Sequence, residues 1–391
     1  MPVALIRRAW LRAVLVVLGS MLAGSVAADA ASPPRESTSV IMRVLGASPQ
    51  GYASAIAPRP FRFPEDHGSH PEFRSEWWYY TGNVIAGDGR RFAFQLTFFR
   101  FALSPRATLR SSAWASNQVY MAHFTVTDID GDRFHAAERF SRAALDLAGA
   151  VATPFRVWLG SWQAGASGAF FPQTLRAEDG GYAIDLRLEQ RKPVVLNGDA
   201  GLSRKSAGAG NASYYYSIPR IAVSGQLTTP GGTRQVEGAA WFDREWSSSA
   251  LAPDPIGWDW FALQLSDGRD LMLYRLRTRD GGTDPHSAGT LVEADGNARS
   301  LAADDFQLDA LAYWRSPRDG ARYPSRWRLR VPSAAIDVEV TPETPDQELN
   351  LAFRYWEGAS RVIGTSASAE VTGHGHVELT GYAPGGAGIP R

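Results

Sequence analysis

The chain has 391 residues with 40 basic and 40 acidic side chains, so its formal net charge is zero, which excludes the broad cationic surface of nucleic-acid-binding proteins. Hydrophobic residues make up 44% and charged residues 20%, which is ordinary globular usage and allows a sizeable core. Cysteine is absent, which excludes disulfides, thiolate nucleophiles and cysteine metal sites.

The first thirty residues have the pattern of an export signal. Three arginines precede an apolar run over 13–27, and small residues follow it. The run is shorter than the roughly 20 apolar residues that span a membrane, so we expect cleavage and no stable membrane insertion. Arg7 and Arg8 resemble a twin-arginine motif, although Ile6 stands where that motif usually has Ser or Thr. The sequence thus predicts a signal peptide over 1–30 and a periplasmic or secreted protein.

Most of the remaining chain has the pattern of short antiparallel strands. Residues 31–58, rich in Ala, Ser and Pro, predict a flexible lead-in. Beyond them, apolar and polar residues alternate with period two, which is typical of half-buried strands, and Asp-Gly pairs indicate tight hairpin turns. The clearest alternating segments are 92–98, 182–189, 271–277, 327–331, 336–340 and 376–382, and the Asp-Gly pairs begin at Asp88, Asp130, Asp179, Asp267 and Asp295.

One segment has helical spacing instead. Over 135–147, Phe140, Ala144 and Leu147 fall on one helical face, which predicts a short amphipathic helix. The protein is nevertheless expected to be mostly β. Because many short strands must hide their edges, we expect the sheets to close into barrels.

Two aromatic-rich hairpins are similar to each other. Residues 77–95 place an aromatic strand before an Asp-Gly turn and a second apolar strand, and residues 259–274 repeat this arrangement. The repetition predicts that one β-barrel unit occurs twice in the chain.

Five segments carry a resemblance to a known family. Residues 66–82 read Asp-His-Gly-Ser-His-Pro-Glu-Phe-Arg-Ser-Glu-Trp-Trp-Tyr-Tyr-Thr-Gly, and residues 238–248 read Gly-Ala-Ala-Trp-Phe-Asp-Arg-Glu-Trp-Ser-Ser. Together with 120–125, 138–141 and 257–260, they resemble the AttH/carotenoid 1,2-hydratase family of lipocalin-like proteins. The resemblance extends over about 61–382.

The resemblance implies an all-β fold of two lipocalin-like (calycin) antiparallel barrels packed together, in agreement with the repeated hairpin. We place an N-terminal lipocalin-like domain at 59–248 and a C-terminal one at 249–386. The resemblance also implies a small hydrophobic ligand, and an ABC transporter permease as a membrane partner. Members of this family are often labelled secreted hydrolases or hydratases, so the resemblance also implies a hydratase-like or hydrolase-like activity.

Three carboxyl groups are candidate acids for such chemistry: Glu76, Asp243 and Glu245. A carboxylic acid can protonate an alkene while indole faces stabilise the resulting cation, after which water adds. The competing interpretation is structural, with Glu76 paired to an arginine and with Asp243 and Glu245 in ion pairs that lock the domains together. For Asp243 we favour the ion pair. Arg244 stands where many family members have His, and because it stays protonated it counts against hydration.

Aromatic residues near these acids are candidate ligand contacts, and a polar motif precedes the first of them. His123 also fits a buried barrel histidine. The polar motif (Asp66, His67, His70) could bind a divalent metal with Glu76, or cap a turn. Because spacing alone supplies no complete ligand set, we predict no metal and no other cofactor. The candidate ligand contacts are Trp77, Trp78, Tyr80, His123, Trp241, Trp246 and Trp260.

Three functions remain open at this point. The leading hypothesis is an exported protein that binds a lipid or terpenoid-like ligand, with a link to an ABC transporter. The alternative is a hydratase-like or hydrolase-like enzyme. No Gly-x-Ser-x-Gly elbow, Walker loop or dinucleotide motif is present, so a hydrolase would lack serine-triad support. The third hypothesis is an interaction module with filled barrels.

Overall fold

The structure, a computed structural model, describes residues 49–106, 111–249 and 256–383. Regular structure in these ranges is almost entirely β, in two antiparallel sheets. None of the helices there is long and apolar enough to cross a membrane. The predicted signal peptide lies outside the described residues. The short helices are the 3-10 turns η1 (Glu65–His67), η2 (Ala303–Asp305) and η3 (Pro332–Ala334).

The first sheet contains the strands up to residue 249. Its spatial order is β4-β3-β2-β1-β13-β12-β9-β8-β7-β6-β5, and β10 and β11 pair separately with β12. Its strands are β1 (Ser75–Ala86), β2 (Arg91–Ala102), β3 (Gln118–Asp128), β4 (Arg133–Arg142), β5 (Ala148–Ala152), β6 (Phe155–Leu159), β7 (Trp162–Gly165), β8 (Gln173–Asp179), β9 (Tyr182–Gln190), β10 (Val195–Leu196), β11 (Leu202–Arg204), β12 (Ala212–Thr229) and β13 (Gly232–Ser249).

The second sheet contains the strands from residue 257 onward. Its spatial order is β17-β16-β15-β14-β23-β22-β20-β19-β18, and β21 pairs with β22. Its strands are β14 (Gly257–Leu265), β15 (Asp270–Arg277), β16 (Ala288–Val292), β17 (Ala298–Ala302), β18 (Gln307–Arg315), β19 (Arg322–Val331), β20 (Ile336–Pro342), β21 (Glu348–Asn350), β22 (Arg354–Ser366) and β23 (Ala369–Leu379).

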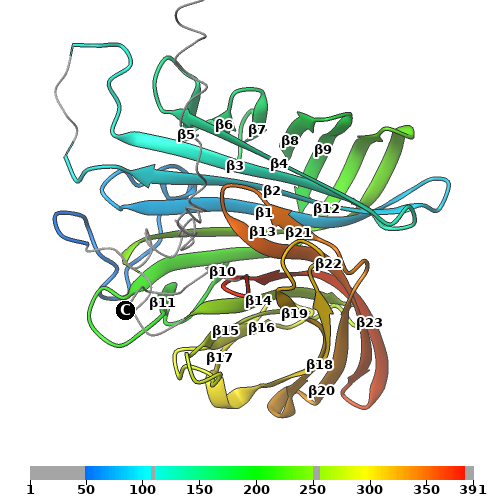
Figure 1. Ribbon diagram of the computed structural model, residues 1–391. Coiled ribbons are helices and arrows are strands. Elements are labelled where there is room, and N and C mark those ends of the chain that lie inside the picture. Colours follow the sequence, from blue (N-terminus) through cyan, green and yellow to red (C-terminus); the bar gives the residue numbers. More distant parts are fainter. Residues whose placement is uncertain (1–48, 107–110, 250–255, 384–391) are drawn as a thin grey trace, which may run out of the picture. The chain divides into compact units, whose positions relative to one another are not determined.

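The two sheets share one pattern of connections, visible in Figure 1. In the first sheet, β1 pairs with β2 on one side and with the last strand, β13, on the other. In the second, β14 pairs with β15 and with the last strand, β23. Each sheet therefore opens with the aromatic hairpin recognised in the sequence, and the prediction of a repeated β unit is confirmed.

Both sheets curl, as expected from the need to cover strand edges. In the first, Phe124 of β3 packs edge-on against Trp162 of β7, and Arg139 of β4 donates a hydrogen bond to Ser161. In the second, Arg275 of β15 donates to the Leu308 carbonyl of β18. The sheets form a near-closed barrel and a curled half-barrel, so the predicted all-β, two-barrel fold class is confirmed.

Three apolar cores hold this fold together. One lies inside the first sheet and contains Trp78, Tyr80 and Trp246, and another lies inside the second sheet. The third joins the sheets and contains Tyr79 and Trp260. Because neighbouring strand residues point to opposite faces, the aromatic run of β1 supplies two different cores.

The Asp-Gly turns are found where the sequence places them. Each of the five pairs joins two consecutive strands of a hairpin. Gly89, for example, has φ +86°, a left-handed conformation that glycine adopts without steric cost.

The helix predicted over 135–147 is wrong. Residues 133–142 form strand β4, paired with β3 along its whole length, and Leu145 and Asp146 form a left-handed turn. Of the three residues on the supposed apolar face, Phe140 and Leu147 are exposed and only Ala144 is buried. Pairing with β3 outweighs the weak helical spacing, since tertiary contacts override marginal local preference.

Part of the predicted flexible lead-in is packed. Ala55 is fully buried against the core of the first sheet. The Tyr52 hydroxyl donates to the Ala102 carbonyl, and the Ala53 amide donates to the Glu72 carbonyl. These contacts tie residues 49–58 to the first sheet, whereas 31–48 lie outside the described residues.

Candidate active site between the two sheets

Strand alternation divides the sequence motifs between two faces of the first sheet. Along β1 and β13, Trp77 lies opposite Glu245 and Tyr79 lies opposite Asp243, and these four residues line a pocket on the face toward the second sheet. Glu76, opposite Trp246, belongs to the other face. The sequence motifs therefore build two separate polar sites.

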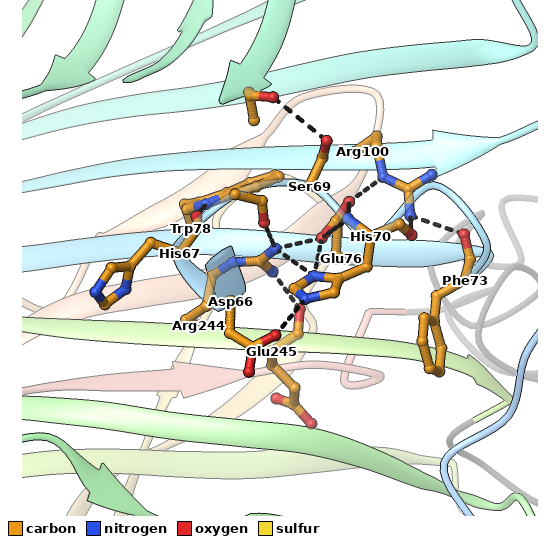
Figure 2. A network of polar contacts seen from close by, with 12 residues as sticks. Asp66, His67, Ser69, His70, Phe73, Glu76, Trp78, Arg100, Arg244 and Glu245 are labelled. Carbon is orange, nitrogen blue, oxygen red and sulfur yellow. Dashed lines mark hydrogen bonds and ion pairs between the residues drawn. The ribbon is translucent and has the colours of Figure 1, made fainter. Parts of the chain in front are cut away.

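The first polar site is a buried ion cluster, which we call the Glu76 cluster (Asp66, His70, Glu76, Arg100 and Arg244). Figure 2 shows both guanidinium groups pointing at the Glu76 carboxylate. The His70 backbone amide donates to the same carboxylate at 2.9 Å, and the His70 ring lies 3.1 Å from Asp66. Every member is buried. The predicted pairing of Glu76 with an arginine is confirmed, and a second arginine joins it.

Glu76 is ionised in this cluster. Burial alone would raise the pKa of Glu76, but Arg100 and Arg244 outweigh it and hold the pKa well below its usual range. The Arg244 guanidinium also lies 3.9 Å from the centre of the Trp78 ring. A carboxylate held in this way has no proton to donate at neutral pH, so the geometry gives Glu76 a structural role.

The two histidines of the polar motif do not converge on a common point. His67 Nδ1 lies 2.6 Å from the Tyr216 hydroxyl, and its ring stacks on Phe170 at 3.4 Å. Burial, followed by the charge of Arg244, lowers the pKa of His67 to about 3. Within the described part of the chain, no three His, Asp or Glu side chains are grouped to hold a metal ion.

The second polar site is a pocket between the sheets. It encloses about 1100 Å³ of empty space, its open mouth included. Most of its wall is aromatic, and acidic side chains enter from strands of both sheets. It is lined by Trp77, Tyr79, Phe99, Phe101, Lys205, Tyr215, Asp243, Glu245, Trp258, Trp260, Tyr274, Leu276, Phe353, Arg354, Tyr355, Glu378 and Thr380.

Asp243 lies in the wall of this pocket with only 3% of its surface exposed. Its Oδ1 accepts hydrogen bonds from Ser217 at 2.5 Å and Trp241 at 2.7 Å, and its Oδ2 accepts one from Tyr215 at 2.5 Å. All three donors are uncharged, and none of the ion pairs in the described residues includes Asp243. The prediction that Asp243 pairs with an arginine is therefore wrong, because Asp243 lines the pocket while its neighbour Arg244 lies on the opposite face of β13 and binds Glu76.

The Asp243 carboxyl group is close to half-protonated at neutral pH. Burial raises its pKa, the three hydrogen bonds lower it, and the nearby Glu245 raises it again, which gives about 7. A carboxyl group with this pKa can hold a proton at neutral pH and release it readily.

Glu245, the third candidate acid, has a cationic partner. Lys205 Nζ lies 3.3 Å from its carboxylate and 3.8 Å from the centre of the Tyr274 ring, and the Ser213 hydroxyl donates to the same carboxylate. Burial lowers the pKa of Lys205, but Glu245 and Tyr274 outweigh it, and the net shift is upward. The predicted ion pair of Glu245 thus forms with lysine rather than arginine.

Two further carboxyl groups, to which no sequence motif points, belong to the second sheet: one lines the pocket, and the other is its cross-strand neighbour. Glu357 of β22 and Glu378 of β23 are directly opposite each other in register, and the charge of Glu378 raises the pKa of Glu357. Glu357 accepts a 2.5 Å bond from Tyr79, and Glu378 accepts one from Trp258, also at 2.5 Å. Acidic residues in strands are common, and only the pairing of β22 with β23 brings these two together.

The predicted ligand contacts fall into three groups. Trp77 and Trp260 line the pocket. Trp241 belongs to the apolar core that joins the sheets and donates a hydrogen bond to Asp243. His123 contacts the pocket residue Tyr355, with Nδ1 2.7 Å from the Tyr355 hydroxyl. The remaining three point into the core of the first sheet and do not line the pocket: Trp78, Tyr80 and Trp246.

Comparison with known proteins places this architecture in a family. A family model described as AttH-like matches residues 54–382. This chain belongs to the AttH-like family. A protein assigned to AttH from Nitrosomonas europaea has a solved structure that is 32% identical, covers 85% of this chain and 100% of its own, and superposes with a TM-score of 0.74.

A second solved structure shares the fold at greater distance. Kievitone hydratase from Nectria haematococca is 16% identical, with a TM-score of 0.65, over 85% of this chain and 96% of its own. At this identity the likeness concerns the fold alone. No curated protein sequence matches the chain.

Proposed function

We propose that this protein binds an apolar, lipid or terpenoid-like molecule between its sheets and adds water to a double bond of that molecule, with Asp243 as the proton donor. One observation carries the proposal. Asp243 is a buried carboxyl group in an aromatic pocket, with uncharged hydrogen-bond donors and a pKa of about 7. An acid of this kind near a cleft is a functional-site candidate on physical grounds.

The pocket suits the binding step. Aromatic side chains such as Trp77, Trp258 and Trp260 form most of its wall, and burial of apolar ligand surface against them is favourable.

The same walls suit the chemical step. A proton that passes from Asp243 to one alkene carbon leaves a cation on the other carbon, and indole faces stabilise a cation by cation–π attraction. Water then attacks that carbon. Arg244 lies on the other face of the sheet, so its replacement of the family histidine leaves this acid unaffected.

The test is turnover of trisubstituted terpenoid alkenes, measured by mass spectrometry as the gain of one water. We expect Asp243→Asn to lower turnover by a factor of about 100 or more, as for loss of a general acid. Asp243→Asn should still bind a fluorescent hydrophobic probe as the parent does. The control variant Asp304→Asn, which alters an exposed carboxylate, should keep the turnover of the parent.

Stability separates this role from a structural one. The folded-state pKa of Asp243 is raised to about 7, so its favourable contribution is complete below the unfolded value of about 4 and is lost as pH rises through about 7. We therefore expect Asp243→Asn to melt at an equal or higher temperature at alkaline pH. A marked loss of stability with unchanged turnover would contradict the proposal.

A carrier function is the second candidate, and the open mouth of the pocket favours it. In that case, the bound ligand would leave unchanged, and an ABC transporter permease, which the family resemblance implies, would receive it. Mass spectrometry of organic extracts from the purified protein decides between the two. A ligand that copurifies with both parent and Asp243→Asn, with no hydrated product from either, supports the carrier.

We also propose that the protein works outside the cytoplasm. The basic and apolar pattern of residues 1–30 supports export and cleavage between about Ala27 and Ala31. N-terminal sequencing of the mature protein tests this. Recovery of an intact Met1 on the mature protein would overturn it.

A further inference from the structure

The acid of the proposed reaction faces a second protonation site across the same pocket. Glu378 is half-buried and lines the pocket, whereas Glu357 behind it is 1% exposed. Glu357 Oε2 is buried and has no hydrogen-bond partner in the described protein. Two facing carboxylates with no cationic partner among the described residues repel each other, which favours one shared proton and a single negative charge on the pair.

The surroundings keep the pair in this state. Its charged and titratable neighbours are anionic or uncharged, and none of the ion pairs formed by the described residues reaches either carboxyl group. The two cations of the pocket have other partners, since Lys205 pairs with Glu245 and Arg354 pairs with Asp319 and Glu348. The groups that face the pair are Tyr79 of β1, Asp243 and Glu245 of β13, Trp258 of β14, and Tyr355 of β22.

The two members of the pair are not equivalent. Burial, followed by the charge of Glu378, raises the pKa of Glu357 well above its usual range. Burial raises that of Glu378 to about 7, against the opposing effect of the Trp258 hydrogen bond. Glu357 is the more deeply buried member, whereas Glu378 lines the pocket and can exchange a proton with a molecule there.

We propose that the Glu357–Glu378 pair is the base that accepts a proton from the attacking water. This inference rests on the proposed function and adds a second catalytic group to it. Asp243 and Glu378 both line the pocket, from different sheets, so an alkene between them would meet an acid on one side and a base on the other.

The proton balance closes. The Asp243 O–H bond breaks, and the π electrons form a C–H bond. The water oxygen then bonds to the cationic carbon while its proton passes to Glu378, and the alkene has gained one water. Return of a proton from Glu378 to Asp243 through solvent in the open pocket restores both groups, and no other reactant is needed.

The shared proton can be tested without any substrate. Infrared spectroscopy of the full-length protein at about pH 9, where Asp243 is ionised, should show a protonated-carboxyl C=O band. We expect Glu357→Gln to abolish this band and Glu370→Gln, on an exposed residue of the same strand, to leave it unchanged. Absence of the band in the parent, or its survival in Glu357→Gln, would overturn the shared proton.

The catalytic role of Glu378 is tested separately, by measuring the turnover of trisubstituted terpenoid alkenes as a function of pH. We expect Glu378→Gln to lower turnover by about 100-fold and to remove the low-pH limb of the rate profile, where the parent pair takes up a second proton. Thermal unfolding would verify that the variant folds. If the low-pH limb remains in folded Glu378→Gln, the pair is not the base.

Failure of this inference differs from failure of the proposed function. If Asp243→Asn keeps full turnover, or if no alkene is hydrated by the parent, the proposed function fails whatever the infrared band shows. If Asp243→Asn is inactive and Glu378→Gln is as active as Glu370→Gln, the acid stands and the base is elsewhere.

Discussion

At the scale of single residues, the direction in which a strand side chain points decides its chemistry. Asp243 and Arg244 are neighbours in sequence, yet Arg244 binds Glu76 inside the first sheet while Asp243 lines the pocket. A charged neighbour along a strand is therefore a poor guide to an ion pair, because adjacent side chains lie on opposite faces. The buried arginines are committed to Glu76, which leaves Asp243 with uncharged partners.

Glu76 should be essential for stability. Glu76→Gln leaves Arg100 and Arg244 buried without their carboxylate, which should cost about 3–5 kcal/mol in the free energy of unfolding. Urea denaturation measures this. Glu339→Gln is the control, because Glu339 and Arg326 form an exposed pair, which contributes at most about 1 kcal/mol.

The pH dependence of stability provides a second check on Glu76. Its folded-state pKa is lowered, so its contribution is complete above the unfolded value of about 4.3 and is lost as pH falls through the folded value. The difference in stability between the parent and Glu76→Gln should therefore shrink in acid. A difference that is independent of pH would contradict an ionised Glu76.

At the scale of elements, strand β1 of the first opening hairpin contributes side chains to two different apolar cores. β1 carries one set of aromatic side chains into the first core and another toward the second sheet. It pairs with both β2 and β13, so it is a central strand. Because β2 and β13 lie close on either side, some positions of β1 have no space for a larger side chain.

Gly82 in β1 should not tolerate a side chain. A Cβ at this position would lie 2.5 Å from the Phe94 ring, so Gly82→Ala should destabilise the protein by about 1–3 kcal/mol through overpacking. Thermal unfolding measures the effect. Gly87→Ala is the matched control, since nothing lies within 4 Å of a Cβ there. Equal melting temperatures for the two variants would show that the Phe94 ring moves aside.

At the scale of the whole molecule, the site exists only because two sheets meet. Polar contacts join them around the pocket: Tyr79 to Glu357, Gln95 to Tyr355 and Thr127 to Gln347. The third apolar core lies beside these contacts. Neither sheet alone contains both the acid Asp243 and the carboxyl pair.

The described residues should therefore unfold as one unit. Because an apolar core and several buried hydrogen bonds connect the sheets, we expect one cooperative transition with equal calorimetric and van't Hoff enthalpies. Scanning calorimetry on the mature protein measures this. Two resolved transitions would show that the interface contributes little and that the pocket can open while each sheet stays folded.

The sequence by itself determined the strands with clear alternation, the Asp-Gly turns and the repeated hairpin, because these depend on local alternation and on Asp-Gly geometry. It also provided the family and drew attention to Glu76, Asp243 and Glu245. It failed over 135–147, where weak helical spacing was overridden by pairing with β3.

Only the tertiary structure decided which acid can hold a proton. The partners that set each pKa come from distant parts of the chain, such as Arg100 for Glu76 and Lys205 for Glu245. Glu357 and Glu378 became visible only when β22 and β23 paired. A carboxyl group's protonation state depends on burial and on the charges packed around it, and neither is local in sequence.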